Sequence, residues 1–382
     1  MQVYLDYAAT TPLDPAVLEA MLPLLREDFG NPSSLHRYGQ RSRRLLETAR
    51  QQVAEAIGAA ARDILFCSGA TEADNHALRA VAAAHPQGHI ITSVLEHSAV
   101  LQTCRQLEAQ GQAVTYLRPN AQGEITLEAV RDALRDDTVL VALMFVNNET
   151  GVISDIARIS ELVHEAGALL FCDAVQAFGC LPIDVNELGV DMLSLSAHKA
   201  YGPKGVGALY IRPGLSLTPL LWGGEQERGL RAGTHNTAAI VGMGACAARL
   251  SQNIAEDAAD IAAKRDYLQA ALLCGQGVHL NAGQAPRSPK HLNVRVEGVD
   301  GEALLVGLDA AGVAVSAGSA CAAGSLEPSH VLLAMGLNWQ EAKASLRFSL
   351  GRGLSYEALD YAAQAFHEVI ARCRSVTPKA LV

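Results

Sequence analysis

Short apolar segments that alternate with amphipathic helical segments are the feature that most constrains how this chain of 382 residues can fold. Residues 64–67 and 168–172 are uninterrupted apolar runs, and each follows a stretch in which apolar residues recur at helical spacing. Strands that are apolar on both faces are typical of parallel sheets covered by helices on both sides. The pattern therefore predicts an α/β fold around a large, mostly parallel sheet. Further strand candidates lie at residues 90–92, 114–116, 139–146, 192–196 and 206–211.

The alternation changes beyond about residue 238, where one long helical stretch extends to residue 273. Strand candidates at 291–296 and 345–350 follow, and a final amphipathic segment covers 356–374. We therefore expect two domains. Residues 15–255 would form a large α/β domain, and residues 1–14 together with 256–382 would form a smaller α+β domain. Hydrophobic residues make up 49% of the chain, which is enough for a large buried core.

Composition excludes several classes of function. The formal net charge of -10 argues against direct binding of nucleic acid through bulk charge. The longest apolar stretches are well below the ~20 residues that a membrane span needs, and the N-terminus carries no basic, apolar leader. Eight cysteines without a C-x-x-C pair predict neither a disulfide framework nor a zinc site. We expect a cytoplasmic protein with no metal and no membrane or nucleic-acid partner.

Lys199 and Asp173 are the first candidates for a catalytic pair. Lys199 follows the strand candidate at 192–196, and Asp173 closes the one at 168–172. Ligands of α/β folds bind where parallel strands end, so both side chains could face one crevice. Taken singly, the lysine is more often a solvated surface residue, and the aspartate is equally a helix N-cap. Together, a lysine that forms a Schiff base and a carboxylate that keeps a pyridine nitrogen protonated are what pyridoxal phosphate (PLP) chemistry requires.

A phosphate site is predicted at residues 66–72, which have the pattern of a strand end, a glycine turn and a helix start. Backbone N–H groups at a helix N-terminus, the Thr71 hydroxyl and the helix dipole together favour an anion. The segment from Ser68 to Glu72 is also similar to a capping box. Both interpretations stay open, because a cap and a phosphate site can share the same residues.

A set of short segments, spread along nearly the whole chain, is the strongest indicator of function. They are residues 4–11 (YLDYAATT), 30–34 (GNPSS), 68–72 (SGATE), 96–97 (EH), 147–151 (NNETG), Asp173 with Gln176, 196–199 (SAHK), 231–234 (RAGT), 319–321 (SAC) and 346–349 (LRFS). With these segments in the family's order, the chain resembles the PLP-dependent cysteine desulfurases of the NifS/IscS type, within the class V aminotransferases. The resemblance implies the PLP-dependent aminotransferase-like fold (fold type I). It also implies conversion of L-cysteine to L-alanine, with the sulfur supplied to iron–sulfur cluster assembly and related sulfur transfer.

The resemblance also implies roles for single residues beside Lys199 and Asp173. His97 should stack on the pyridine ring and transfer protons, and Arg347 should bind the substrate carboxylate with its guanidinium fork. Thr234 should reach the phosphate of the partner subunit, which implies a homodimer. The remaining assignments are Asn148 and Gln176 near the ring hydroxyl, with Asn148 also near the substrate carboxylate, and Ala70, Thr71, Ser196 and His198 around the phosphate.

Cys321 is the candidate sulfur acceptor among the eight cysteines. It alone stands in a long run of small residues, 314–325, which we expect to form a mobile, solvent-reachable loop. Cys67 and Cys172 lie within apolar strand candidates, where a buried and inert thiol is expected. The Cys321 thiolate would take the substrate sulfur as a persulfide and carry it to an iron–sulfur scaffold or another acceptor protein. The resemblance selects the same residue, and a tight packing contact is the structural alternative.

Other functions remain open at this stage. A selenocysteine lyase or a PLP aminotransferase would use the same cofactor, and the aminotransferase would not need Cys321. A non-catalytic scaffold would not need Lys199, Asp173 and Thr71 together. Two residues depart from the family pattern: Ala197 stands where glycine is common, and His235 follows Thr234 without an explanation in the sequence.

Overall fold

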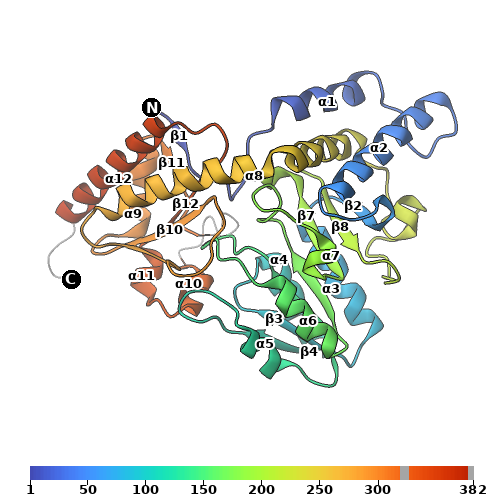
Figure 1. The fold of residues 1–382 in the computed structure, drawn as a ribbon, viewed down its shortest axis with the longest axis horizontal. Helices are drawn as coiled ribbons and strands as arrows, with labels where there is room; N and C mark the ends of the chain where they lie inside the picture. Colours follow the sequence, from blue (N-terminus) through green and yellow to red (C-terminus); the bar gives the residue numbers. More distant parts are fainter. Residues whose placement is uncertain (319–326, 377–382) are drawn as a thin grey trace.

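The computed structural model describes residues 1–318 and 327–376, and its largest element is a seven-stranded sheet (Figure 1). The sheet has the strand order β2-β8-β7-β6-β5-β3-β4. All neighbouring strands are parallel except β8, which is antiparallel to both β2 and β7. The predicted large, mostly parallel sheet is thus confirmed. The strands are β2 (Ile64–Cys67), β3 (His89–Ser93), β4 (Ala113–Leu117), β5 (Thr138–Met144), β6 (Leu169–Asp173), β7 (Met192–Ser196) and β8 (Gly207–Ile211).

Helices cover both faces of this sheet. They are α1 (Pro15–Arg26), α2 (Arg37–Glu55), α3 (Ala70–Ala84), α4 (Ser98–Ala109), α5 (Leu127–Ala133), α6 (Ile156–Glu165) and α7 (Val185–Leu188). Leu170 and Cys172 of β6 pack into a cluster with apolar residues of α2 and α6. Phe171, between them, packs into the opposite cluster with α3 and α4. Because successive strand residues point to opposite faces, a sheet covered on both sides needs the uninterrupted apolar strands seen in the sequence.

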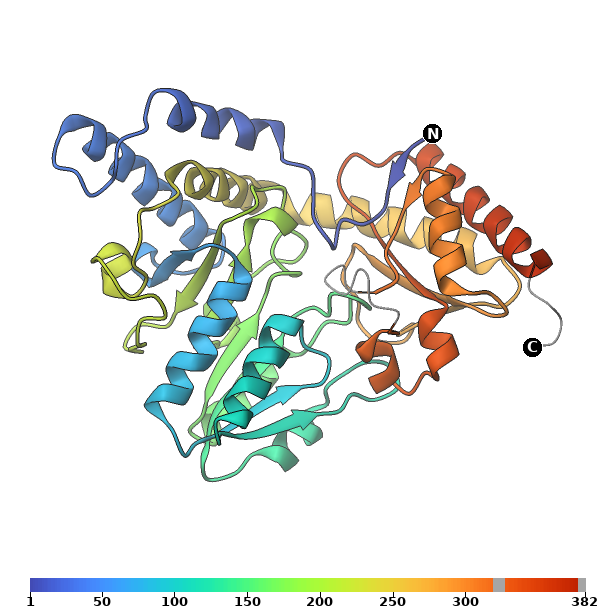
Figure 2. The same cartoon turned by 180° about the vertical axis from the view of Figure 1, so that it is seen from behind.

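The long helix α8 (Thr237–Leu273) joins the large sheet to a second core (Figure 2). Ile240 and Met243, near its start, belong to the core beneath the large sheet, whereas Leu268 and Leu272 belong to the second core. The predicted domain boundary at residues 255 and 256 falls inside this helix, and the division into two domains stays a prediction. The second core contains β9 (Val278–Leu280), β10 (His291–Val296), α9 (Gly301–Ala310), β11 (Val313–Ala314), β12 (Ser345–Ser349) and α12 (Tyr356–Val376), with α10 (His330–Ala334) and α11 (Trp339–Lys343) beside it.

The N-terminal segment connects the seven-stranded sheet to a small antiparallel sheet of three strands, in the order β12-β10-β9, and brings its backbone to the region between them. Strand β1 (Val3–Tyr4) pairs with β11, and Asp6 forms a bridge with Ser349 of β12. A few residues later, Thr11 donates its backbone N–H to the carbonyl oxygen of His198, at 3.0 Å. Residues 6–11 therefore lie between the small antiparallel sheet and the strand ends of the large one. Within the described part of the chain, the helices fall short of the length and apolar character that crossing a membrane requires.

Candidate active site

A cavity of about 400 Å³ opens where the strands β5, β6 and β7 end. This is the edge at which α/β folds bind ligands. Residues from the large sheet, the N-terminal segment and β12 line it together. The structure therefore brings most of the site residues predicted from the sequence into one place. Those that line the cavity are Ala70, Thr71, His97, Asn148, Asp173, Gln176, Ser196, His198, Lys199 and Arg347.

Lys199 reaches the cavity from a short 3-10 turn, Ala197–Lys199, that directly follows β7. Its Nζ donates hydrogen bonds to the carbonyl oxygens of Ala8 and Ala9, at 2.7 and 2.6 Å. These carbonyls belong to the N-terminal segment that crosses between the two sheets. The amine is therefore held at a defined point of the cavity wall.

Asp173 is the last residue of β6, on the strand that neighbours β7. Its Oδ1 accepts the backbone N–H of Val175 at 3.0 Å, and the side chain is buried. Burial raises the pKa of Asp173 above its ordinary value, although His97, the Val175 N–H and Lys199 oppose the rise. A cation beside this buried carboxyl would favour its ionised form, and a protonated pyridine nitrogen is a cation of that kind.

The predicted phosphate turn lies between β2 and α3. Glu72 in the first turn of α3 accepts the backbone N–H of Ser68 at 2.9 Å, but the N-cap residue is Gly69, which has no side chain to complete the predicted capping box. Strand β8 approaches this turn closely: a Cβ on Gly207 would lie 2.5 Å from the Leu195 carbonyl oxygen and 2.7 Å from Gly69 Cα. Only glycine permits this approach, which places the β8 backbone against the turn.

Ser196 and His198, from the end of β7, line the same cavity as the phosphate turn. His198 Nδ1 lies 3.2 Å from the hydroxyl oxygen of Thr10. Burial, helped by the charges of Lys199 and nearby lysines, lowers the pKa of His198 to about 4. The imidazole is therefore neutral at neutral pH, and it can donate or accept a hydrogen bond without adding charge.

The donor and acceptor set fits PLP. Gln176 donates its Nε2 hydrogen to the Ala8 carbonyl oxygen at 3.0 Å. Its Oε1 is buried and has no hydrogen-bond partner among the residues that the structure describes. A ring hydroxyl could satisfy this acceptor, while the amine of Lys199, the carboxylate of Asp173 and the helix N-terminus at Thr71 match the aldehyde, ring nitrogen and phosphate.

Arg347 enters the cavity from the small sheet, in the centre of β12. Its side chain is 1% exposed. Nη1 donates to the backbone oxygen of Asn148 and Nη2 donates to Asp6 Oδ1, both at 2.7 Å. Nε is buried without a partner in residues 1–318 and 327–376. The guanidinium is thus held rigidly from two sides, and sequence reasoning did not foresee its pairing with Asp6.

Two buried carboxyls near Asp173 were also missed. Asp74 of α3 lines the cavity, and Glu96 accepts a hydrogen bond from the Ser93 hydroxyl at 2.6 Å. Burial raises the pKa of Glu96 to about 8, with the Asp173 charge acting in the same direction. Burial and Asp173 likewise raise the pKa of Asp74 well above its ordinary value. Glu96 stood beside His97 in a matching segment, whereas Asp74 carried no signal in the sequence.

Two predicted residues are not in this cavity. Thr234 is exposed and lines a neighbouring cavity of about 240 Å³, which shares Ser68 and Gly205 with the larger one. Cys321 lies outside the described residues. None of the cysteines that the structure describes lines the larger cavity. Burial raises the thiol pKa of six of them, namely Cys67, Cys104, Cys172, Cys180, Cys246 and the half-buried Cys373.

Comparison with known proteins agrees with this geometry. The cysteine desulfurase IscS of Aeromonas salmonicida is 48% identical over 385 residues, which cover 99% of this chain and 95% of that protein. A solved structure described as a NifS-like protein has a TM-score of 0.92 at 36% identity, covering 97% of this chain and all of that one. Another, described as SspA in complex with cysteine, has a TM-score of 0.82 at 37% identity and covers 92% of this chain and 99% of that one.

These similarities extend over both sheets and the cavity between them, so they confirm the predicted aminotransferase-like fold of type I. The sequence also matches the family Aminotransferase class-V over residues 3–361, which include every residue of the site. A lysine and an aspartate at the ends of two neighbouring strands and an arginine from β12 converge in the cavity of such a chain. The protein therefore belongs to the class-V aminotransferase family.

Proposed function

We propose that this protein is a PLP-dependent cysteine desulfurase, which converts L-cysteine to L-alanine and supplies the sulfur for iron–sulfur cluster assembly. The observation that carries the proposal is one cavity that combines Lys199, Asp173 and Arg347. Lys199 and Asp173 match the reactive ends of the cofactor, and Arg347 matches the carboxylate of an amino acid. Relatives named cysteine desulfurase, at 48% identity over nearly the full chain, support the choice of cysteine as substrate.

Residues of the cavity wall would hold the cofactor. Lys199 would bind its aldehyde, Asp173 would pair with the ring nitrogen, and Gln176 with Asn148 would lie at the ring hydroxyl. His97 would stack on the ring, and the phosphate would lie at Ala70, Thr71, Ser196 and His198. When bound, PLP withdraws electrons from the substrate Cα, which makes the Cα proton acidic and the Cβ–S bond breakable.

Arg347 binds the substrate carboxylate and thereby fixes which face of the amino acid meets the reacting groups. The guanidinium is already oriented by the Asn148 carbonyl oxygen and by Asp6, so little side-chain entropy is lost when the substrate binds. Asp6 also balances the positive charge of Arg347 while the site is without substrate. The Arg347–Asp6 pair therefore suits a substrate with one carboxylate group and not a substrate with a second anionic group.

Lys199 Nζ takes the Cα proton of the substrate, and His97 serves in proton transfer. The Cys321 thiolate then attacks the substrate sulfur, so that an S–S bond forms as the Cβ–S bond breaks. The electron pair of the broken bond stays with the carbon fragment, which takes up one proton at Cβ, regains the proton at Cα and leaves as L-alanine. The sulfur remains on Cys321 as a persulfide. High thiol pKa values at the five buried cysteines make those residues poor competitors as nucleophiles.

The working enzyme is a homodimer in which Thr234 reaches the phosphate of the partner subunit. Its exposed position outside the main cavity of its own subunit supports this role. Large apolar side chains that a monomer would leave in water give further support, since such groups mark interaction surfaces. They include Phe29, Leu35, Tyr38 and Trp222. We place the enzyme in the cytoplasm, because a persulfide carrier needs a compartment that keeps its thiol reduced.

The test is to incubate the purified holoenzyme with L-cysteine and a thiol reductant and to quantify alanine, sulfide and 3-mercaptopyruvate. A desulfurase forms alanine and sulfide in equal amounts. Formation of 3-mercaptopyruvate that depends on an added keto acid, without sulfide, would instead identify an aminotransferase and refute the proposal. A much higher rate with selenocysteine than with cysteine would indicate a selenocysteine lyase.

A further inference from the structure

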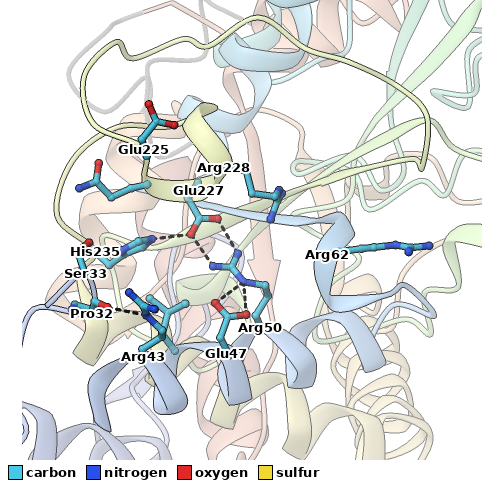
Figure 3. Close-up of a pocket in the computed structure, with 12 residues that line it drawn as sticks. Pro32, Ser33, Arg43, Glu47, Arg50, Arg62, Glu225, Glu227, Arg228 and His235 are labelled. Carbon is cyan, nitrogen blue, oxygen red and sulfur yellow. Dashed lines mark hydrogen bonds and ion pairs between the residues drawn. The ribbon is translucent and has the colours of Figure 1, made fainter. Parts of the chain in front are cut away.

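A buried network of charged side chains lies outside the active-site cavity, around Glu227 (Figure 3). Arg50 of α2 donates two hydrogen bonds to the Glu227 carboxylate, both at 2.7 Å. His235 Nε2 lies 2.7 Å from the same carboxylate. The Glu227 side chain is 1% exposed, so this is an ion pair withdrawn from water and not a surface bridge.

The carboxylate at the centre of the network is ionised. Burial alone would raise its pKa, but the hydrogen bonds from Arg50 and His235 outweigh burial and lower the pKa of Glu227 to about 2. A carboxylate can only accept hydrogen bonds, so His235 must donate through Nε2–H. The contact is therefore a charge-assisted hydrogen bond, which is roughly twice as strong as one between neutral groups.

This network is attached to the strand that leads into the phosphate turn. Glu227 also accepts the backbone N–H of Phe66 at 2.9 Å, and Arg50 donates to the Ile64 carbonyl oxygen at 3.0 Å. Phe66 and Ile64 belong to β2, whose last residue directly precedes Ser68. Glu227 has a left-handed backbone, with φ of 47°, which is unfavourable for a residue with a side chain. Its side-chain bonds compensate for that conformation.

His235 connects this anchored carboxylate to the segment that carries Thr234. Thr234 is exposed, whereas the adjacent imidazole is turned inward with its side chain 13% exposed. A second link supports the same segment: Arg231 Nε donates to Glu72 at 2.8 Å, in the first turn of α3. Residues 231–235 are thus tied at both ends to the elements that flank the phosphate turn.

We propose that His235 is a positioning residue of the phosphate site. Its hydrogen bond to Glu227 fixes the position of Thr234 relative to β2, the strand that leads into the phosphate turn. The inference rests on the proposed function, because it takes Thr234 to contact the phosphate of PLP in the partner subunit. It also gives a physical role to a residue that the family pattern left unexplained. Without this link, the segment would retain the Arg231–Glu72 contact and the backbone N–H bonds of Ala232 and Gly233, and Thr234 would lose the side-chain anchor next to it.

The experiment compares binding of PLP with binding of pyridoxal, which lacks the phosphate. Full-length wild-type, His235→Ala and His235→Gln proteins are freed of cofactor with hydroxylamine and titrated with each compound, with visible absorbance as the readout. The glutamine amide reaches about as far as Nε2 and can donate to Glu227, so it is the conservative variant. His279→Ala is the matched control, because His279 also lies 2.8 Å from a glutamate, Glu297, but belongs to the small sheet.

We expect His235→Ala to weaken PLP binding about tenfold while pyridoxal binding changes less than twofold, as loss of one hydrogen bond to a charged group predicts. His235→Gln should restore most of the PLP affinity, and His279→Ala should match wild type. Equal weakening for both compounds, or no weakening for either, would overturn the inference. If His235→Ala does not fold, His235→Asn, whose amide is too short to reach Glu227, carries the same prediction. Desulfurase activity of the wild-type protein is assayed separately, so that a failure of the proposed function can be distinguished from a failure of the inference about His235.

Discussion

Replacing Arg347 with lysine tests how the site recognises its substrate. Lysine keeps the positive charge but loses the planar fork that matches a carboxylate through two parallel hydrogen bonds. In the structure, the guanidinium uses one donor on Asp6 and one on the Asn148 carbonyl oxygen, and it still has donors left for a ligand. A lysine ammonium in the same place has only three donors for all of these acceptors.

The size of the effect follows from this count of donors. At least one hydrogen bond to the substrate carboxylate is lost, and a hydrogen bond to a charged group contributes about 1.5–3 kcal/mol. Such a loss corresponds to a decrease of roughly 10- to 150-fold in kcat/KM for cysteine. The carboxylate does not react, so it is held equally in the ground state and in the transition state. The decrease should therefore come mainly from a higher KM.

The assay measures sulfide release from L-cysteine and from cysteamine, which has the same amine and thiol but no carboxylate. Arg347→Lys should lower kcat/KM for cysteine and leave that for cysteamine within about threefold, because only cysteine uses the lost contact. Arg295→Lys is the control. Arg295 lies on the neighbouring strand β10 and donates to Asn281, and it does not line the cavity.

Two results would refute the reasoning. If KM for cysteine changes less than twofold, Arg347 does not hold the carboxylate. If both substrates lose activity equally, the substitution has damaged the site in general, since removal of a fully buried arginine also disturbs Asp6. Circular dichroism and the visible absorbance of bound PLP separate this second outcome from loss of the fold.

Three further predictions concern other parts of the molecule. Lys199→Ala should abolish the visible absorbance of the bound cofactor, whereas Cys321→Ala should keep it and lose sulfide release; sulfide release at the wild-type rate would exclude Cys321. Because burial raises the folded-state pKa of Glu96 to about 8, its protonated form stabilises the fold at low pH, and this contribution is lost as the pH rises through 8. Glu96→Gln should thus gain thermal stability relative to wild type between pH 6 and pH 9, and a difference that does not depend on pH would contradict this. Gly207→Ala should destabilise the protein by about 1–3 kcal/mol in denaturant unfolding and weaken PLP binding, because the new methyl group would overlap the backbone at Gly69; unchanged PLP affinity would show that β8 does not support the turn.

Much of the fold could be read from the pattern of apolar residues. Strands buried on both faces are mostly apolar, and this is why the strands at 64–67 and 192–196 could be bounded to the residue, although Ser194 and Ser196 stand within the second. The antiparallel direction of β8 could not be read, because an apolar run carries no information about strand direction. The sequence indicated α8 as one long helical stretch. It did not indicate that this helix joins two separate cores.

The residues of the site also differ in whether a local sequence pattern could predict them. Lys199, Asp173 and the phosphate turn could be predicted because each ends or begins an element with a periodic pattern, and parallel strands bring such ends to one edge. The resemblance to a known family added Arg347 and His97, which no local pattern distinguishes. The structure places Lys199, Asp173, Arg347 and His97 in one cavity, but the roles of all these residues stay proposals, as do those of Cys321 and Thr234.

Sequence by itself determined what is local: which segments are strands and helices, which strand ends carry reactive groups, and which cysteine lies among small residues. The tertiary structure alone decided what depends on contact between distant segments. It placed Asp6 against Arg347, the carbonyls of Ala8 and Ala9 against Lys199, and Glu227 between Arg50 and His235. The physical reason is that a buried charge requires a partner, while the pattern of residues around it does not say which of many possible partners the fold will bring within hydrogen-bond distance.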